Sequence, residues 1–231
     1  MVRRDVIYLR QVLAIAGKDL RSEVRSKETV NASLSFAVVI LLLFSFAFDP
    51  SAETVREISG GLLWLVFAFA GALVLNRSFA RELANDCLDS LIASPTSGGQ
   101  LFLGKSIANF VLLIAVEIVC VPVFGIFYNV AWTKQVGWLA IVFALGTWAL
   151  TVIGTMFSAL TVNLRLRELM LPILVYPMMI PAIMGAIQLT TVLMTGAPPT
   201  PADMIWVRLL IGFDIIFTIL GLGLVEIVLI G

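Results

Sequence analysis

The sequence contains no histidine among its 231 residues. Histidine is the commonest general base in enzymes and a common ligand of zinc and of heme iron. Its absence excludes hydrolases whose catalytic triad depends on histidine. Any metal or heme chemistry would have to use methionine, cysteine, tyrosine or carboxylate side chains, or residues of another subunit.

Charged residues and cysteines are also scarce. Lys, Arg, Asp and Glu together make up 13% of the chain, which is about half of their usual share in a soluble domain. The formal net charge is zero, so no basic excess indicates a nucleic-acid partner. Cys87 and Cys120 fit neither a disulfide framework nor a zinc site. In contrast, 60% of the residues are apolar and the mean hydropathy is +1.05, so we expect most of the surface to face lipid.

Six apolar stretches are long enough to cross a membrane, which takes about 20 residues of α-helix. They are Val30–Phe48, Ile58–Leu75, Ile107–Tyr128, Gly137–Leu160, Leu169–Met194 and Val207–Ile230. The first is not expected to be a cleavable signal peptide, because about thirty charged and polar residues precede it and no A-x-A site follows. The sequence therefore predicts an all-α polytopic membrane protein, with residues 1–231 forming a single transmembrane domain.

The positions of Lys and Arg predict the orientation of the bundle. Most of the 15 basic residues lie before the first span, after the second and after the fourth. The other side has only Arg56, Lys134 and Arg208. Since Lys and Arg are concentrated on the cytoplasmic side of membrane proteins, both termini are predicted to be cytoplasmic.

Residues 1–28 are expected to form a cytoplasmic amphipathic helix. Apolar residues recur at spacings of three and four: Val6, Leu9, Leu13, Ala16, Leu20 and Val24. Basic residues lie opposite them: Arg3, Arg10, Lys18, Arg21 and Arg25. This pattern predicts a helix lying on the anionic surface of the cytoplasmic leaflet, either as a simple anchor or as a transporter-specific elbow helix.

Residues 76–106 form the longest predicted cytoplasmic loop. We expect a short helix at about Ala80–Ala93, stopped by Pro95 and a turn at Thr96–Gly99. Its charged side chains are a predicted docking surface for a soluble partner: Arg81, Glu82, Asp86 and Asp89.

Gly99–Ser106 matches the phosphate-binding pattern G-x-x-x-x-G-K-[ST]. A real phosphate-binding loop joins a buried strand to a helix. Here a turn precedes the motif, its middle residues are bulky and apolar, and a membrane span follows. We therefore predict no nucleotide site and interpret Lys105 as a positive anchor at the cytoplasmic interface.

Carboxylates inside predicted spans are candidates for function. Glu117 lies five residues before Pro122, near the middle of the third span. A carboxylate at that depth should face the bundle interior, pair with another group or be protonated. It could belong to a substrate path or hinge, form a hydrogen bond between helices, or couple transport to protons. Asp214, within reach of Arg208 or the outer interface, and Glu226, near the cytoplasmic end, are predicted to be structural.

The fifth span is predicted to be kinked or broken, because it contains three prolines: Pro172, Pro177 and Pro181. A broken helix would indicate a position near a partner interface or a pathway, whereas a merely bent helix would be structural. Small residues at Ala68–Ala72, Gly146 and Gly154 predict close packing between helices.

Several short segments resemble the heme exporter protein B (CcmB) family. They are Gly61-Leu-Leu-Trp64, Ser78-Phe-Ala-Arg-Glu82, Leu88-Asp-Ser-Leu91, Ser94-Pro95, Leu103-Gly-Lys105, Ala108-Asn109 and Leu171-Pro-Ile-Leu-Val-Tyr-Pro-Met-Met-Ile-Pro181. The Arg-Glu, Leu-x-x-Leu, Pro and Gly-Lys parts are shared with permeases of type-two ABC exporters. The triple-proline span and short outer loops single out the CcmB group. The resemblance extends from about Ala16 to about Leu229.

The resemblance implies a permease subunit of the cytochrome c maturation system in a bacterial inner membrane. Such a subunit is not itself an enzyme, because a separate cytoplasmic ABC subunit hydrolyses ATP. Other maturation membrane proteins and a second copy of this chain are the further partners implied. Heme is implied as a transported or handled ligand, either through export or through ATP-driven release of a heme-loaded chaperone. No cofactor or metal is assigned to the chain itself, and the missing histidine suits chaperone release.

The expected mechanism is mechanical. Closure of the ATPase would push on the helix at residues 81–93, which contains the four candidate coupling residues, and shift the second and third spans. Glu117, Pro122 and the three prolines of the fifth span are the candidate pathway or hinge residues. Three alternatives stay open: an ABC exporter permease for a drug, lipid or polysaccharide, an ion-coupled carrier using Glu117, and a non-transporting assembly scaffold.

Overall fold

The computed structural model describes residues 2–48, 53–79, 96–161 and 167–230. Within these ranges the chain forms seven α-helices and one 3₁₀-helix. They are α1 (Val2–Ser26), α2 (Glu28–Ala47), α3 (Glu53–Arg77), α6 (Gly98–Tyr128), η1 (Trp132–Gln135), α7 (Val136–Thr161), α8 (Arg167–Met194) and α9 (Met204–Ile230). All except α1 and η1 are long and apolar enough to cross a membrane, in agreement with the six predicted spans.

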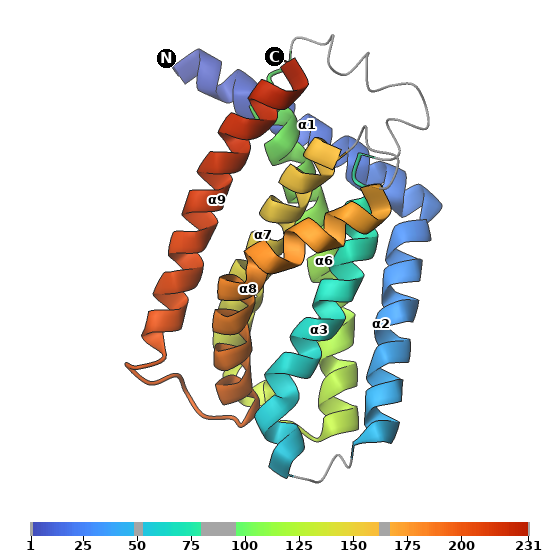
Figure 1. Cartoon of the computed structure of the whole chain (residues 1–231), viewed down its shortest axis with the longest axis vertical. Coiled ribbons are helices and arrows are strands. Elements are labelled where there is room, and N and C mark those ends of the chain that lie inside the picture. Colours follow the sequence, from blue (N-terminus) through green and yellow to red (C-terminus); the bar gives the residue numbers. More distant parts are fainter. Residues whose placement is uncertain (1, 49–52, 80–95, 162–166, 231) are drawn as a thin grey trace.

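Helix α1 lies across one end of the bundle that the other six helices form (Figure 1). It joins α2 through a tight turn at Lys27, whose φ of 55° is left-handed. The carboxylate of Glu23 accepts hydrogen bonds from the backbone N–H groups of Thr29 (2.8 Å) and Val30 (3.0 Å). These N–H groups belong to the first turn of α2, where backbone N–H groups have no acceptor within their own helix. The same end of a helix favours a negative charge. Glu23 therefore fixes the direction in which α2 leaves α1.

Helix α6 begins nine residues before the predicted third span. Ser97 and Gln100 form a capping box: the Ser97 side chain accepts from the Gln100 N–H, and the Gln100 side chain accepts from the Ser97 N–H. This cap starts the helix at Gly98. The predicted turn at Thr96–Gly99 is therefore wrong in its second half, and the loop between α3 and α6 is shorter than residues 76–106.

The hydrophobic core is centred on α7, which packs against α3, α6, α8 and α9. Trp64, Phe67 and Phe143 form an edge-to-face aromatic cluster, an arrangement that aromatic rings favour. Gly146 lies against the outer edge of the Trp64 ring, which a Cβ atom at this position would overlap. A Cβ atom at Gly154 would likewise overlap the Leu75 side chain. The small residues of α7 thus allow the close helix packing that the sequence predicted.

Helix α8 is bent but not broken. It contains all three prolines and remains a single helix from Arg167 to Met194. Figure 1 shows it running obliquely across the bundle in its first half and along the bundle in its second. Each proline removes one backbone donor, which accounts for the bend.

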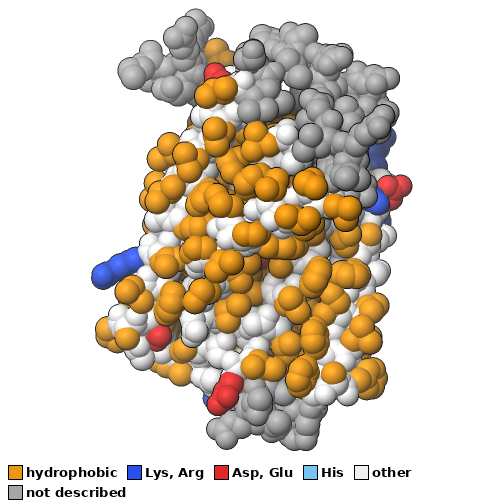
Figure 2. Space-filling model, in the orientation of Figure 1, with side chains coloured by type: hydrophobic (Ala, Val, Ile, Leu, Met, Phe, Trp, Pro, Cys, Tyr) orange, Lys and Arg blue, Asp and Glu red, His pale blue; other side chains and the backbone are white. Residues whose placement is uncertain are grey.

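Hydrophobic side chains cover most of the face shown in Figure 2, with few charged groups among them. Exposed Ile, Leu, Val and Phe side chains occur on all six long helices. A surface of this kind suits the hydrocarbon of a bilayer.

Candidate functional site

A buried lysine lies at the end of the bundle covered by α1. The side chain of Lys105, on α6, is 0% exposed. Its Nζ donates to Asp19 Oδ2 of α1 (3.1 Å) and to the backbone oxygen of Ser78 (2.6 Å), just after α3. The same atom lies 4.7 Å from the centre of the Phe79 ring, close enough for a cation–π contact. One buried cation therefore joins three segments of the chain.

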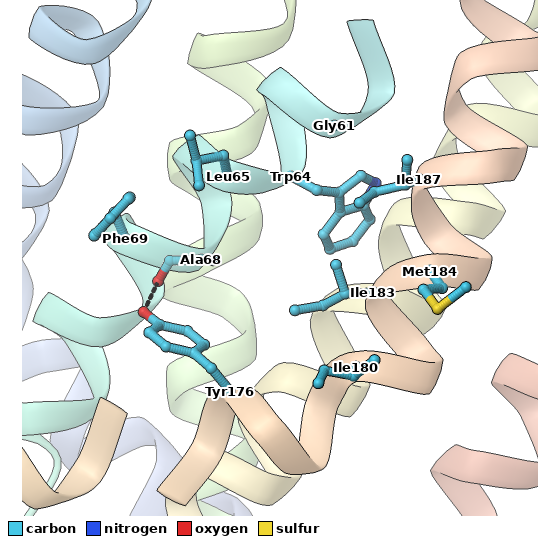
Figure 3. Close-up of a pocket in the computed structure, with 10 residues that line it drawn as sticks. All are labelled: Gly61, Trp64, Leu65, Ala68, Phe69, Tyr176, Ile180, Ile183, Met184 and Ile187. Carbon is cyan, nitrogen blue, oxygen red and sulfur yellow. Dashed lines mark hydrogen bonds between the residues drawn. The ribbon is translucent and has the colours of Figure 1, made fainter. Parts of the chain in front are cut away.

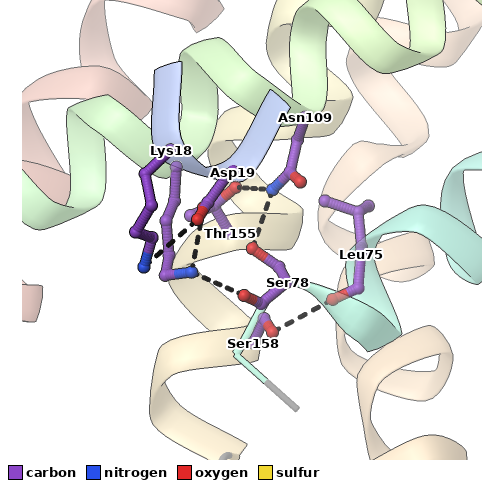
Figure 4. A network of polar contacts seen from close by, with 8 residues as sticks. Lys18, Asp19, Leu75, Ser78, Asn109, Thr155 and Ser158 are labelled. Atoms are coloured by element: carbon purple, nitrogen blue, oxygen red, sulfur yellow. Dashed lines mark hydrogen bonds and ion pairs between the residues drawn. The ribbon is translucent and has the colours of Figure 1, made fainter. Parts of the chain in front are cut away.

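A second set of hydrogen bonds extends this contact to α7 (Figure 4). Asn109 donates to Ser78 Oγ (3.0 Å) and to Thr155 Oγ1 (2.9 Å). Ser158 donates to the backbone oxygen of Leu75 (3.1 Å), in the last turn of α3. We call Asp19, Leu75, Ser78, Phe79, Lys105, Asn109, Thr155 and Ser158 the Lys105 cluster.

The position of the Lys105 cluster makes it a candidate for coupling the predicted docking segment to the transmembrane helices. Ser78 and Phe79 are the last described residues before the segment 80–95, and the cluster holds them against α1, α6 and α7. Polar groups buried in this way are costly unless all are paired. Through these hydrogen bonds, a force applied to segment 80–95 would be passed from Ser78 to α6, and from there to α1 and α7.

The four predicted coupling residues, Arg81, Glu82, Asp86 and Asp89, lie outside the described residues, and so does Cys87. Their predicted docking role stays a prediction. The residues that hold the start of this segment were not predicted from the sequence. One signal was present: Asp19 lies on the side of its helix that carries Val12 and Ala16, where an acidic residue needs an internal partner.

The phosphate-loop match has a packing explanation. Gly99–Ser106 is helical throughout, within α6. A Cβ atom on Gly104 would lie 2.7 Å from Ile15 Cβ of α1. The glycine is therefore needed where α1 crosses α6. The interpretation of Lys105 as a positive anchor at the cytoplasmic interface needs correction, because its side chain is buried and its charge is satisfied inside the protein by Asp19 and the backbone oxygen of Ser78.

Glu117 lies in the interior of the bundle, as expected, with 3% of its surface exposed. Thr147 of α7 donates a hydrogen bond to Glu117 Oε1, whereas Oε2 has no partner among the described residues. Pro122 follows within the same helix. The contact with Thr147 is the predicted hydrogen bond between helices, and it joins α6 to α7.

The other two span carboxylates differ from each other. Asp214 on α9 is buried, and neither of its oxygens has a partner among the described residues. It does not pair with Arg208, which is exposed. Glu226 is exposed at the end of the bundle covered by α1, consistent with the predicted position.

A groove of about 420 Å³ lies between α3 and α8 at the bend (Figure 3). The Trp64 Nε1 donates to Thr190 Oγ1 (2.9 Å), and the Tyr176 hydroxyl donates to the Ala68 backbone oxygen (2.9 Å). The polar groups of both aromatic side chains are thus already paired. The groove presents apolar side chains, including Met184.

Among the described residues, no three His, Cys, Asp or Glu side chains are grouped as a metal site would require. Cys120 is a buried free thiol.

Comparison with known proteins adds an independent finding. The family model described as "CcmB protein" matches residues 10–222. A protein of Rhodobacter capsulatus named heme exporter protein B is 30% identical over 76% of this chain and 80% of its own length. Proteins of the same name from Paracoccus denitrificans and Pseudomonas aeruginosa are 28% and 26% identical, over 82% and 84% of this chain and 86% of each relative.

Proposed function

The chain belongs to the CcmB family, and we propose that it is the membrane permease subunit of an ABC transporter acting in cytochrome c maturation. The match over residues 10–222 is the observation that carries this proposal. The six long apolar helices fit a multi-pass membrane protein. The CcmB chain is the permease, and ATP hydrolysis belongs to a partner subunit.

The ATPase partner binds, in this proposal, at the end of the bundle covered by α1, which faces the cytoplasm of a bacterial cell. The distribution of Lys and Arg supports this orientation. The segment 80–95 starts at this end, directly after the part of the Lys105 cluster that Ser78 and Phe79 contribute. The transporter contains two copies of this chain and other membrane proteins of the maturation system.

Coupling would proceed through the start of that segment. Closure of the ATPase on nucleotide moves residues 81–93, and the movement is passed to Ser78. Ser78 is bonded to Lys105 and Asn109, so α6 moves with it. Asn109 also contacts Thr155, and Lys105 contacts Asp19, which brings in α7 and α1.

The printed name of the relatives, heme exporter protein B, points to export of heme as one form of the activity. The second form that we propose is ATP-driven release of a heme-loaded chaperone. The apolar groove between α3 and α8 would suit contact with a hydrophobic ligand. The lack of histidine favours chaperone release, because the chain has no imidazole to hold heme iron.

A complementation experiment tests the proposal. A strain lacking its own maturation permease receives this gene with its neighbouring ATPase gene, and covalent heme is stained in c-type cytochromes. We expect staining that disappears when the ATPase cannot hydrolyse ATP. No restoration, despite membrane insertion and co-purification of the ATPase, would instead indicate a permease for another cargo.

The same strains separate the two forms of activity and the ion-coupled alternative. With the inactive ATPase, heme export predicts a chaperone without heme, whereas chaperone release predicts a heme-loaded chaperone that stays bound to the complex. Maturation that persists with the inactive ATPase and depends strongly on external pH would favour a carrier using Glu117, whose Oε2 lacks a partner among the described residues.

A further inference from the structure

Helix α1 has three distinct faces, whereas the sequence predicted two. Val12, Ile15 and Ala16 are buried, with 2%, 8% and 3% of their surfaces exposed. They pack towards α6, where Gly104 allows the helices to approach closely. Ala16 therefore belongs to the contact with the bundle and not to the predicted membrane face.

A second face of α1 is apolar and exposed. Leu9 and Leu13 are each 61% exposed, and Val24 is 69% exposed. At about 100° per residue, these three side chains point in nearly the same direction, beside the buried face. No described part of the chain covers them. A soluble protein would rarely leave such a row in water.

The third face carries only positive charge. Arg10, Arg21 and Arg25 are exposed and share one side of α1. None of them has an ion-pair partner among the described residues.

The acidic residues of α1 with described side chains both point to the protein interior. Asp19 is bonded to Lys105, and Glu23 accepts from the N-terminal N–H groups of α2. Because these two negative charges are compensated internally, the outward surface of α1 is cationic.

We propose that this outward surface is a binding site for anionic phospholipid headgroups of the bilayer. Arg10, Arg21 and Arg25 contact the headgroups, while Leu9 and Leu13 enter the boundary with the acyl chains. A basic face beside an apolar face is the arrangement that holds a helix in an anionic membrane surface. The turn at Lys27 leads directly into the span α2, so α1 lies at the depth where headgroups are found.

The test uses the purified full-length chain in a neutral detergent. Phosphatidylglycerol or phosphatidylcholine is added in increasing amounts, and the midpoint of thermal unfolding is followed by tryptophan fluorescence. We expect phosphatidylglycerol, but not phosphatidylcholine, to raise the midpoint. The triple variant Arg10→Gln, Arg21→Gln, Arg25→Gln should need far more phosphatidylglycerol, with a weakening of about fivefold for each arginine removed.

The matched control is Arg77→Gln, which removes a cation at the same end of the bundle but outside α1. It should respond to phosphatidylglycerol as the unaltered chain does. An unchanged response in the triple variant would overturn the proposal, and so would an equal effect of inorganic phosphate alone. The three single variants apply the same criterion if the triple variant is not recovered in folded form. No transport assay is involved, so the result is independent of the proposed function.

Discussion

Replacing Lys105 with methionine would remove the charge of the Lys105 cluster while keeping most of the side-chain volume. The change deletes the hydrogen bonds to Asp19 Oδ2 (3.1 Å) and to the Ser78 backbone oxygen (2.6 Å). A hydrogen bond involving a charged group contributes about 1.5–3 kcal/mol. The bond to Asp19 contributes less, because that side chain is 21% exposed and Lys18 lies 3.3 Å from its other oxygen. We expect a total loss of about 2–4 kcal/mol in the free energy of unfolding.

The assay is a double-mutant cycle on the purified chain in mixed micelles, unfolded with a denaturing detergent. The cycle compares Lys105→Met, Asp19→Asn and the double variant. Because both single changes break the same bond, the double variant should be about 1–2 kcal/mol more stable than the sum of the single effects predicts.

Additive effects, within about 0.5 kcal/mol, would refute the interaction between these two side chains. The functional consequence has a separate readout. Lys105→Met should insert in the membrane and bind the ATPase, but support little ATP-dependent cytochrome c maturation. Full maturation in a variant with the expected instability would show that the Lys105 cluster is purely structural.

Three further changes address other contacts. Glu23→Ala removes the cap of α2 and should lower the free energy of unfolding by about 1 kcal/mol, measured in the same micelles. The control is Arg25→Ala, which leaves the cap in place; an equal loss in this control would contradict a capping role for Glu23. Gly146→Ala places a methyl group against the Trp64 ring and should cost about 1–3 kcal/mol, with a shifted tryptophan emission; an unchanged spectrum and stability would argue against the packing. The third change reverses the charges of the acidic docking residues Glu82, Asp86 and Asp89 together. It should uncouple ATP hydrolysis from the permease in the purified complex without preventing membrane insertion. Normal coupling in this variant would contradict their assignment as docking residues.

The six spans were predictable from the sequence because length and hydropathy alone determine them. The start of α6 was not, because Gly98 and Gly99 resemble a turn until the reciprocal bonds of Ser97 and Gln100 are known. Glycine occurs both in turns and at close contacts between helices. The local sequence does not distinguish these two roles. The long-range contact with Ile15 of α1 decides the case at Gly104.

The candidate site was predictable only in part. Glu117 could be placed inside the bundle because a carboxylate in a span has few other options. The burial of Lys105 could not be predicted, since its partner Asp19 is 86 positions away in the sequence. A lysine at the end of an apolar stretch normally reaches the interface, and only the tertiary contact reverses that expectation.

Two buried or half-buried acidic side chains of α1 also limit how this helix can move. Asp19 attaches it to α6, and Glu23 attaches it to α2. The two attachment points are four residues apart, which is about 6 Å along the helix axis. Rotation of α1 about its axis, or sliding along it, would have to break these hydrogen bonds. When the bilayer thins or thickens, α1 would therefore keep its place at the membrane surface only if α2 and α6 move with it. The depth of these two spans in the bilayer would then follow the position of α1.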